Sequence, residues 1–301
     1  MKRIKLILSV FLLINVNLFL ACSNASSNSD SSSKSKPEPE TDAYIGTKAP
    51  GETKELGDII FTDGSAISYK YADKMSIQQK KSAIAIIYYV GTDCTESNDI
   101  DEKGKLRERI LGVGLVHSGG WWCDKTADAF GKNINTIICD CDSYSVTSGY
   151  FTFNNAIDKD GRNNLEQIEA FEGVNDTSDS SKYPAFYFAI NYKDAIHFGD
   201  SESRIKSDSE FATGWYLPTM AELYYIYIFR DSIANLDALS SSCGGDLFGN
   251  YEYWSSSLSK DSSAADSTSC GAPFLSFENG GIGFYTSGGD PQRVCAIREF
   301  N

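Results

Sequence analysis

The chain has 301 residues, with 41 acidic against 27 basic side chains, so its formal net charge is -14 at pH 7. This acidic balance argues against a nucleic-acid partner and against attraction of the folded part to an anionic membrane surface. It excludes little else, because net charge alone does not select a ligand.

The first 21 residues predict an export signal that is removed. Basic residues near the start are followed by an apolar run from Leu6 to Leu20, which is too short and too interrupted for a membrane span. The run ends in Phe19-Leu20-Ala21-Cys22, which resembles the lipobox of bacterial lipoproteins. That resemblance implies cleavage before Cys22 and acylation of this residue, which would be the only contact with the membrane. The alternative is a plain cleaved signal. We expect an outer-membrane lipoprotein that is exposed on the cell surface.

Residues 22–43 predict a disordered tether. They are rich in Ser, Asn, Asp, Pro and Glu and contain no large apolar residue before Tyr44, so they cannot bury enough surface to offset the entropy of ordering. Residues 44–301 follow without a second low-complexity break and are enough for one large domain or two small ones.

The first half of this domain predicts short strands separated by glycine-rich turns, with a few helices. The most apolar run, Ile84–Val90, is β-branched and aromatic throughout, which is typical of a strand covered on both faces at the centre of a sheet. The other expected strands lie at residues 59–61, 66–71, 112–116, 119–123 and 135–139. Helices are expected at residues 76–82, 164–171 and 183–192, with a helical turn at 124–130. The fold class is therefore α+β.

The stretch 214–229 predicts a short strand that leads into a buried helix. Thr219 and Glu222 form a capping box, in which each side chain accepts a hydrogen bond from a backbone N–H of the first turn. The helix should therefore begin directly after Thr219. Before it, Gly214–Leu217 should enter as a strand with Trp215 and Leu217 on one face.

The C-terminal part predicts further strands. Phe274–Phe277 and Ile282–Tyr285 flank Asn279-Gly280, which predicts a hairpin with a two-residue type I′ turn. Another strand is expected at residues 251–255. The chain should close as one strand over 293–300, with residues 294–297 buried on both faces.

Three motifs in order carry a resemblance to a known family. They are Gly-Trp-Tyr-Leu-Pro-Thr-Met-Ala-Glu-Leu at 214–223, Tyr-Trp-Ser-Ser-Ser at 253–257 and Val-Cys-Ala-Ile-Arg-Glu-Phe at 294–300. They resemble the bacterial C-type-lectin-like family that is related to formylglycine-generating enzyme and to the C-terminal domain of the Legionella collagen-like adhesin. The lipoprotein start, Ala85–Gly91 and the ending also resemble the variable proteins of Treponema, which are targets of diversity-generating retroelements. The resemblance implies a C-type lectin-like fold of short mixed strands with packed helices, supported by Trp254.

The same resemblance implies that the segment 253–301 displays a variable ligand-binding surface. Its small polar residues and scattered aromatics suit adaptable binding loops, although an ordinary solvated loop and hairpin would have a similar composition. The expected partner is a protein or glycan on a host or neighbouring cell, bound by a monomer. The expected ligand-binding residues, here called the display residues, are Leu258, Asp261, Ala272, Phe274, Phe284, Tyr285, Thr286, Asp290 and Arg293.

The sequence offers little catalytic or metal-binding chemistry. His117 and His197 are too few and too isolated for histidine-based metal ligation. Residues 158–164 are rich in Asp and Asn, but their spacing does not fit an EF-hand loop, which leaves only a looser calcium site open. The calcium and sugar motif of true C-type lectins is absent as well. We therefore expect no catalytic residue, no metal and no cofactor.

The cysteines leave an alternative function open. If Cys22 carries lipid, the remaining number is odd, and Cys270 in the display segment is the expected free thiol. Six others should form disulfides whose pairing the sequence does not decide; they are Cys94, Cys123, Cys139, Cys141, Cys243 and Cys295. The alternative is an exported oxidase of the formylglycine-generating type, or another enzyme that depends on thiols.

Overall fold

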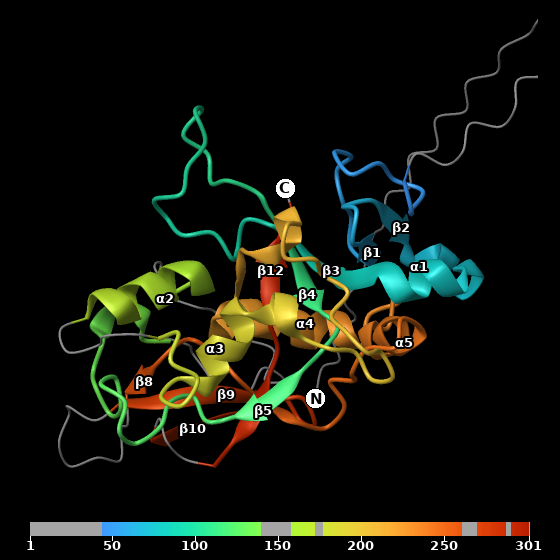
Figure 1. The fold of residues 1–301 in the computed structure, drawn as a ribbon. Coiled ribbons are helices and arrows are strands. Elements are labelled where there is room, and N and C mark those ends of the chain that lie inside the picture. The colour runs from blue at the N-terminus through green and yellow to red at the C-terminus, as the bar shows by residue number, and fades with distance from the viewer. Residues whose placement is uncertain (1–43, 140–157, 172–176, 261–269, 287–289, 301) are drawn as a thin grey trace, which may run out of the picture. The chain divides into compact units, whose positions relative to one another are not determined.

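The computed structural model describes residues 44–139, 158–171, 177–260, 270–286 and 290–300 (Figure 1). The chain divides into two units, Met1–Thr41 and Asp42–Asn301.

The first sheet is antiparallel and has the strand order β2-β1-β3-β4-β12-β6. Strand β3 (Ala83–Gly91) is buried along most of its length and lies between β1 and β4, as the apolar run in the sequence predicts. The last β-strand of the chain, β12, pairs with β4 on one side and β6 on the other. The other strands are β1 (Asp58–Phe61), β2 (Ala66–Ser68), β4 (Arg109–Gly114), β6 (Trp215–Tyr216) and β12 (Ile297–Glu299).

The second sheet has the order β10-β9-β7-β11-β5, with β8 paired to β9. All pairs are antiparallel except β11 with β7. This sheet holds most of the display residues. Its strands are β5 (Ser118–Gly120), β7 (Glu252–Trp254), β8 (Ser259–Lys260), β9 (Cys270–Ser276), β10 (Ile282–Thr286) and β11 (Gln292–Val294).

Five α-helices and several short 3-10 helices complete the described ranges, and the fold is α+β. The predicted helical turn at residues 124–130 consists of turns without a helix. No helix in these ranges has the length and apolar character that a membrane span requires. The α-helices are α1 (Ile77–Ser82), α2 (Gly161–Ala170), α3 (Pro184–Ile190), α4 (Met220–Arg230) and α5 (Leu236–Ser242).

The helix α4 begins where the capping box predicts. Thr219 Oγ1 accepts a hydrogen bond from the Glu222 backbone N–H at 3.1 Å, and Glu222 Oε2 accepts one from the Thr219 N–H at 2.9 Å. Each bond satisfies a donor that the first helical turn cannot pair. The local sequence is therefore sufficient to place this end of the helix.

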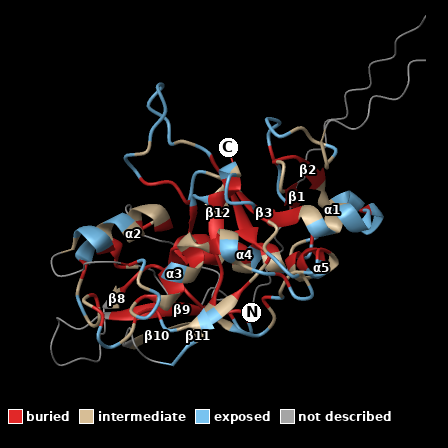
Figure 2. Ribbon diagram, viewed as in Figure 1, coloured by how far each residue is buried: buried red, intermediate tan, exposed pale blue. Residues whose placement is uncertain are grey.

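Buried residues run along the inner strands, such as β3 and β9 (Figure 2). They form two apolar cores, and the side chains of some strands alternate between these cores. Trp215 and Leu217 pack into the first core and Tyr216 into the second, which confirms the predicted face of Gly214–Leu217. The second sheet repeats this division, because Trp254 belongs to the first core and Tyr253 to the second. Side chains alternate along a strand, so one strand can serve two cores.

The end of the chain is not the single strand that the sequence predicts. Strand β11 belongs to the second sheet and β12 to the first, and the chain crosses between them at Cys295 and Ala296. Both crossing residues are 0% exposed, and Ala296 O accepts a hydrogen bond from the Gly114 N–H at 2.9 Å. The apolar run 294–297 is therefore buried as predicted, but because it connects two sheets.

The hairpin of β9 and β10 lies where Asn279-Gly280 predicts it, but its turn is longer than expected. Leu275 pairs with Ile282, and the Ser276 N–H donates to Gly281 O at 2.8 Å, so four residues form the loop. Only Gly280 has a positive φ, of 70°. The predicted type I′ turn is wrong, since that turn requires a positive φ at both central residues.

Candidate ligand-binding face

The display residues divide into a buried group and a partly exposed group. Leu258, Ala272 and Phe274 are 1%, 0% and 7% exposed, so their expected position on an open surface is wrong. Asp261 and the side chain of Thr286 lie outside the described residues. The remaining display residues, Phe284, Tyr285, Asp290 and Arg293, are at least partly exposed.

Leu258 is buried because a segment from far earlier in the chain covers it. Its backbone N–H donates to Ile137 O at 2.8 Å, and its carbonyl accepts from the Cys139 N–H at 2.7 Å. These bonds form a parallel bridge between Leu258 and Ile138. The side chains of Leu258 and Ile137 thereby join the first core.

Phe274 is buried because the rings of Trp254 and Tyr285 and the backbone of β10 cover it. Its ring lies 5.1 Å from the Tyr285 ring in a stacked arrangement and 5.9 Å from the Trp254 ring edge-on. Gly283 faces Phe274 across the strand pair, and a Cβ at this position would come within 2.2 Å of Phe274 Cζ. The glycine therefore allows Phe274 to lie against the backbone of β10 and to hold Tyr285 from below.

Arg293 lies in strand β11 beside exposed Tyr251, and Asp290 precedes this strand. The Arg293 guanidinium is 4.9 Å from the ring centroid of Tyr251, a cation–π distance. Arg293 pairs in register with Tyr253 of β7. The Tyr253 hydroxyl lies 2.8 Å from His117 Nδ1. Burial, and then the charge of Arg293, lower the pKa of His117 to about 3, so this imidazole is neutral at pH 7. Arg293 thus sits over a neutral aromatic support.

The two exposed groups lie against different cores. Tyr285 packs on Trp254 and Phe274, which belong to the first core. Arg293 lies beside Tyr253, which belongs to the second core. The structure therefore places Tyr285 and Arg293 toward different cores, on opposite sides of the second sheet, and does not bring them into one cluster.

The Tyr-Trp-Ser-Ser-Ser motif at 253–257 is a buried hydrogen-bonding support for this sheet. Trp254 Nε1 donates to Gly120 O at 2.9 Å, which ties β7 to β5. Ser255 Oγ donates to Pro273 O at 2.9 Å, and Ser257 Oγ accepts from the Met220 N–H at 3.0 Å. Small hydroxyl side chains suit these positions because each one pairs a backbone group that water cannot reach.

A buried ionic centre joins α4 to the first sheet, and sequence reasoning missed its main member. Arg109 is 0% exposed, and its guanidinium contacts Glu222 at 3.1 Å, Glu299 at 3.3 Å and the Tyr216 hydroxyl at 2.6 Å. A buried arginine with carboxylate partners from distant segments has no local sequence signal. Only Glu222, through its capping box, stood out in the sequence.

Glu222 serves both the helix cap and the ionic centre. Its Oε1 accepts from Arg109 and from the Tyr216 hydroxyl at 2.9 Å, while Oε2 accepts from Thr219 and from the Gly161 N–H at 3.1 Å. Burial raises the pKa of Glu222 to about 7, although the charge of Arg109 opposes this shift. The centre is structural, because backbone and side-chain donors occupy both carboxylate oxygens.

The predicted set of six disulfide-bonded cysteines is wrong. Cys94, Cys243 and Cys295 are free thiols, and all three are buried. Burial raises the pKa of each of these thiols above its ordinary value. A reactive cysteine requires a lowered pKa and access to solvent. These three thiols therefore lend no support to a thiol-dependent reaction. Cys141 and the side chain of Cys270 lie outside the described residues.

The acidic stretch at residues 158–164 forms the start of α2. Asp160 is the N-cap, with Oδ1 accepting from the Arg162 N–H at 2.9 Å. Asp158 is 1% exposed and accepts from Asn164 Nδ2 at 2.7 Å and Ser257 Oγ at 2.9 Å. Within the described ranges no group of three or more His, Cys, Asp or Glu residues could hold a metal ion.

Comparisons with known proteins do not assign the chain to a family. No protein-family model matches it, and no curated protein matches it at a significant level. Among solved structures, a fimbrial protein from Bacteroides ovatus ATCC 8483 is similar, with a TM-score of 0.48 and 16% sequence identity. The match covers 82% of this chain and 49% of that protein, so the chain spans about half of its length.

Proposed function

We propose that this protein is a lipid-anchored surface protein that presents a ligand-binding face to a protein or glycan partner. In this proposal Cys22 carries the lipid, residues 22–43 hold the domain away from the outer membrane, and the second sheet faces outward. The scaffold is of the C-type lectin-like type, and the face varies between copies as in the variable proteins that the sequence resembles.

The observation that carries the proposal is the contrast between a fixed support and adaptable side chains on one sheet. Trp254 is 0% exposed and hydrogen-bonded, and the Ser residues beside it pair backbone groups of β9 and α4. Tyr285 beside Trp254 is partly exposed, and so is Arg293 on the other side of the sheet, beside Tyr251, which is 54% exposed. Aromatic and arginine side chains on a rigid base are the groups that dominate binding interfaces.

Burial divides the display residues into two roles. Leu258, Ala272 and Phe274 shape the sheet from below and belong to the scaffold. Phe284, Tyr285, Asp290 and Arg293 supply the contacts of the proposed face, and Asp261 and Thr286 remain proposed members of it.

Binding of the full chain to a glycan array and to a panel of host extracellular proteins tests the proposal. With the strongest hit as probe, Asp290→Ala combined with Arg293→Ala should weaken binding at least tenfold, because the charged contacts at the face are lost. Lys103→Ala, an exposed change in the loop before β4, is the matched control and should bind as the parent does. Equal affinity of the double variant and the control would refute the proposed face.

The anchor is tested separately. Cys22→Ala should move the protein from the membrane fraction to the soluble fraction, because the proposed lipid is its only attachment. Retention of the variant in the membrane would contradict the lipoprotein interpretation and leave the binding face untouched.

A further inference from the structure

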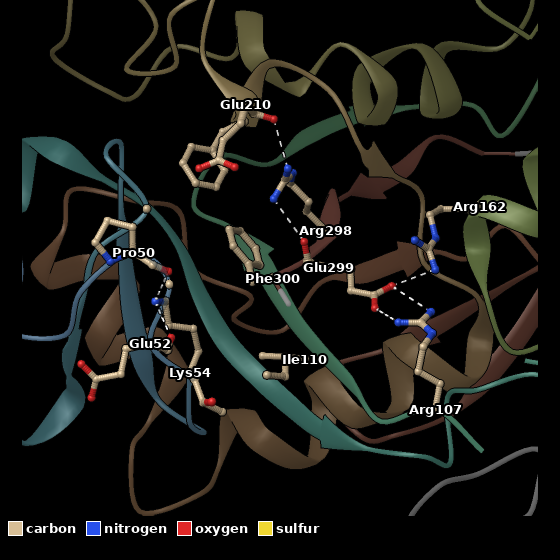
Figure 3. Close-up of a pocket in the computed structure, with 14 residues that line it drawn as sticks. Pro50, Glu52, Lys54, Arg107, Ile110, Arg162, Glu210, Arg298, Glu299 and Phe300 are labelled. Carbon is tan, nitrogen blue, oxygen red and sulfur yellow. Dashed lines mark hydrogen bonds and ion pairs between the residues drawn. The ribbon is translucent and has the colours of Figure 1, made fainter. Parts of the chain in front are cut away.

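A pocket of about 570 Å³ lies beside the first sheet, and Figure 3 shows the residues that line it. None of the display residues is among them. The pocket opens between the loop 50–54 and strand β12. Cavities of roughly 300–1,000 Å³ are the size that holds small organic ligands. Its lining includes the apolar side chains of Ile110, Phe211 and Phe300, and charged side chains surround them.

One wall of the pocket is held rigid by a buried lysine. Lys54 is 5% exposed, and its ammonium group donates to the carbonyls of Ala49, Pro50 and Glu52 at 2.8, 2.8 and 2.7 Å. These three bonds use all of its donors. Lys54 therefore shapes the loop and has no donor left for a ligand.

The arginines on the opposite wall are already neutralised. Arg107 pairs with Asp99 at 2.8 Å and also with Glu299. Arg162 pairs with Asp160 at 2.6 Å and with Glu299 at 2.8 Å. Figure 3 shows both guanidinium groups converging on the Glu299 carboxylate. Their charges are matched within the protein.

Arg298 differs from these two arginines because its hydrogen bonds go to neutral groups. Its guanidinium donates to the carbonyls of Thr213 and Glu210 at 3.0 Å each and of Glu299 at 3.1 Å. None of the ion pairs of the described residues includes it. Three of its N–H groups are used, so two remain, and the carbonyls hold the group in one orientation.

Aromatic rings complete the surroundings of Arg298. The guanidinium carbon lies 4.8 Å from the ring centroid of Phe211 and 5.2 Å from that of Phe300. Burial lowers the pKa of Arg298, with the charges of Glu210 and Glu299 opposing the shift. The pocket thus contains an oriented cation beside an apolar floor.

Two further charged groups line the same pocket and have the opposite sign. Glu52 and Glu210 are exposed, and neither takes part in an ion pair of the described residues. Glu52 accepts only a backbone bond, from Ala49 N–H at 3.2 Å, among the hydrogen bonds of this region. A simple organic anion would be attracted by Arg298 but repelled by these two carboxylates.

We propose that this pocket binds a small zwitterion with an apolar body, which is the chemistry of an apolar α-amino acid or a short apolar peptide. The ligand carboxylate pairs with the two remaining N–H groups of Arg298. The ligand ammonium group pairs with Glu210 or Glu52, and the apolar body lies on Ile110 and Phe300. This arrangement satisfies the unmatched charges of both signs, whereas a carboxylic acid or an amine alone would satisfy one.

Calorimetric titration of the full chain with matched probes tests this assignment. L-phenylalanine carries both charges, phenylacetate lacks the amine, and 2-phenylethylamine lacks the carboxylate. L-phenylalanine should bind saturably and at least tenfold more tightly than either single-charge probe. The dipeptide phenylalanyl-leucine distinguishes the two ligand sources, since tighter binding than L-phenylalanine indicates a peptide site and weaker binding an amino-acid site. Equal binding of phenylacetate and L-phenylalanine, or no binding of either zwitterion, would overturn the proposal.

Variants locate the binding in this pocket. Glu210→Gln removes one rim carboxylate and Thr53→Trp fills the opening from an exposed position, so neither should change the melting temperature. Each should reduce L-phenylalanine binding at least fivefold. Glu202→Gln, an exposed change in another loop, is the matched control. Unchanged binding to a folded Thr53→Trp variant would place the ligand elsewhere and refute the pocket. Because Arg298 also ties β12 to its neighbours, its substitution is a weaker test than these two.

Discussion

The burial of Leu258 can be tested by truncating its side chain. Leu258 is 1% exposed in the first core, and residues 137–139 cover it through backbone hydrogen bonds. Leu→Ala at a buried site typically costs ~2–5 kcal/mol of unfolding free energy, because transfer energy is lost and a cavity remains. For a domain of this size each kcal/mol lowers the melting temperature by about 2–4 °C. A cost near 3 kcal/mol then means a decrease of about 6–12 °C.

The matched control is Leu247→Ala, because Leu247 is 46% exposed. An exposed change of this kind stays within about 0.5 kcal/mol, or about 2 °C. Leu258→Met keeps the volume and should cost less than about 1.5 kcal/mol. Thermal unfolding followed by circular dichroism, with urea unfolding as a second measure, distinguishes these cases. If Leu258→Ala and Leu247→Ala melt together, Leu258 is exposed, and the role expected from its sequence is restored.

The ionic centre and the cysteines provide the remaining predictions. Burial raises the pKa of Glu222 from 4.5 to about 7, so the folded state binds more protons than the unfolded state between these pH values. The contribution of Glu222 to stability therefore falls as pH rises through this window. The difference in unfolding free energy between the parent and Glu222→Gln should decrease from pH 4.5 to pH 7 in urea titrations, and a constant difference would contradict the assignment. Cys94, Cys243 and Cys295 should resist Ellman's reagent in the native protein, so at least three additional thiols should react in urea. No gain of thiols on unfolding would mean that they are paired.

Several features of this protein follow from local sequence, because each depends on neighbouring residues. The start of α4 needs only Thr219 and Glu222, whose side chains pair the backbone of the same turn. The buried character of β3 follows from its unbroken apolar run, since such a strand must be covered on both faces. Trp215 and Leu217 face the same core because side chains two residues apart lie on the same face of a strand.

Other features depend on which distant segments the fold brings together. From the sequence, Leu258 is expected on the surface because serines surround it. It is buried because residues 137–139 pack over it. The last apolar run reads as one strand, but its residues divide between two sheets because β12 pairs with β4 and β11 with β5 and β7. Arg109 has no local signal at all, since its partners Glu222 and Glu299 come from other elements. Local hydrogen bonds and periodicity are encoded within a few residues, whereas burial and ion pairing are properties of contacts that exist only after the chain has folded.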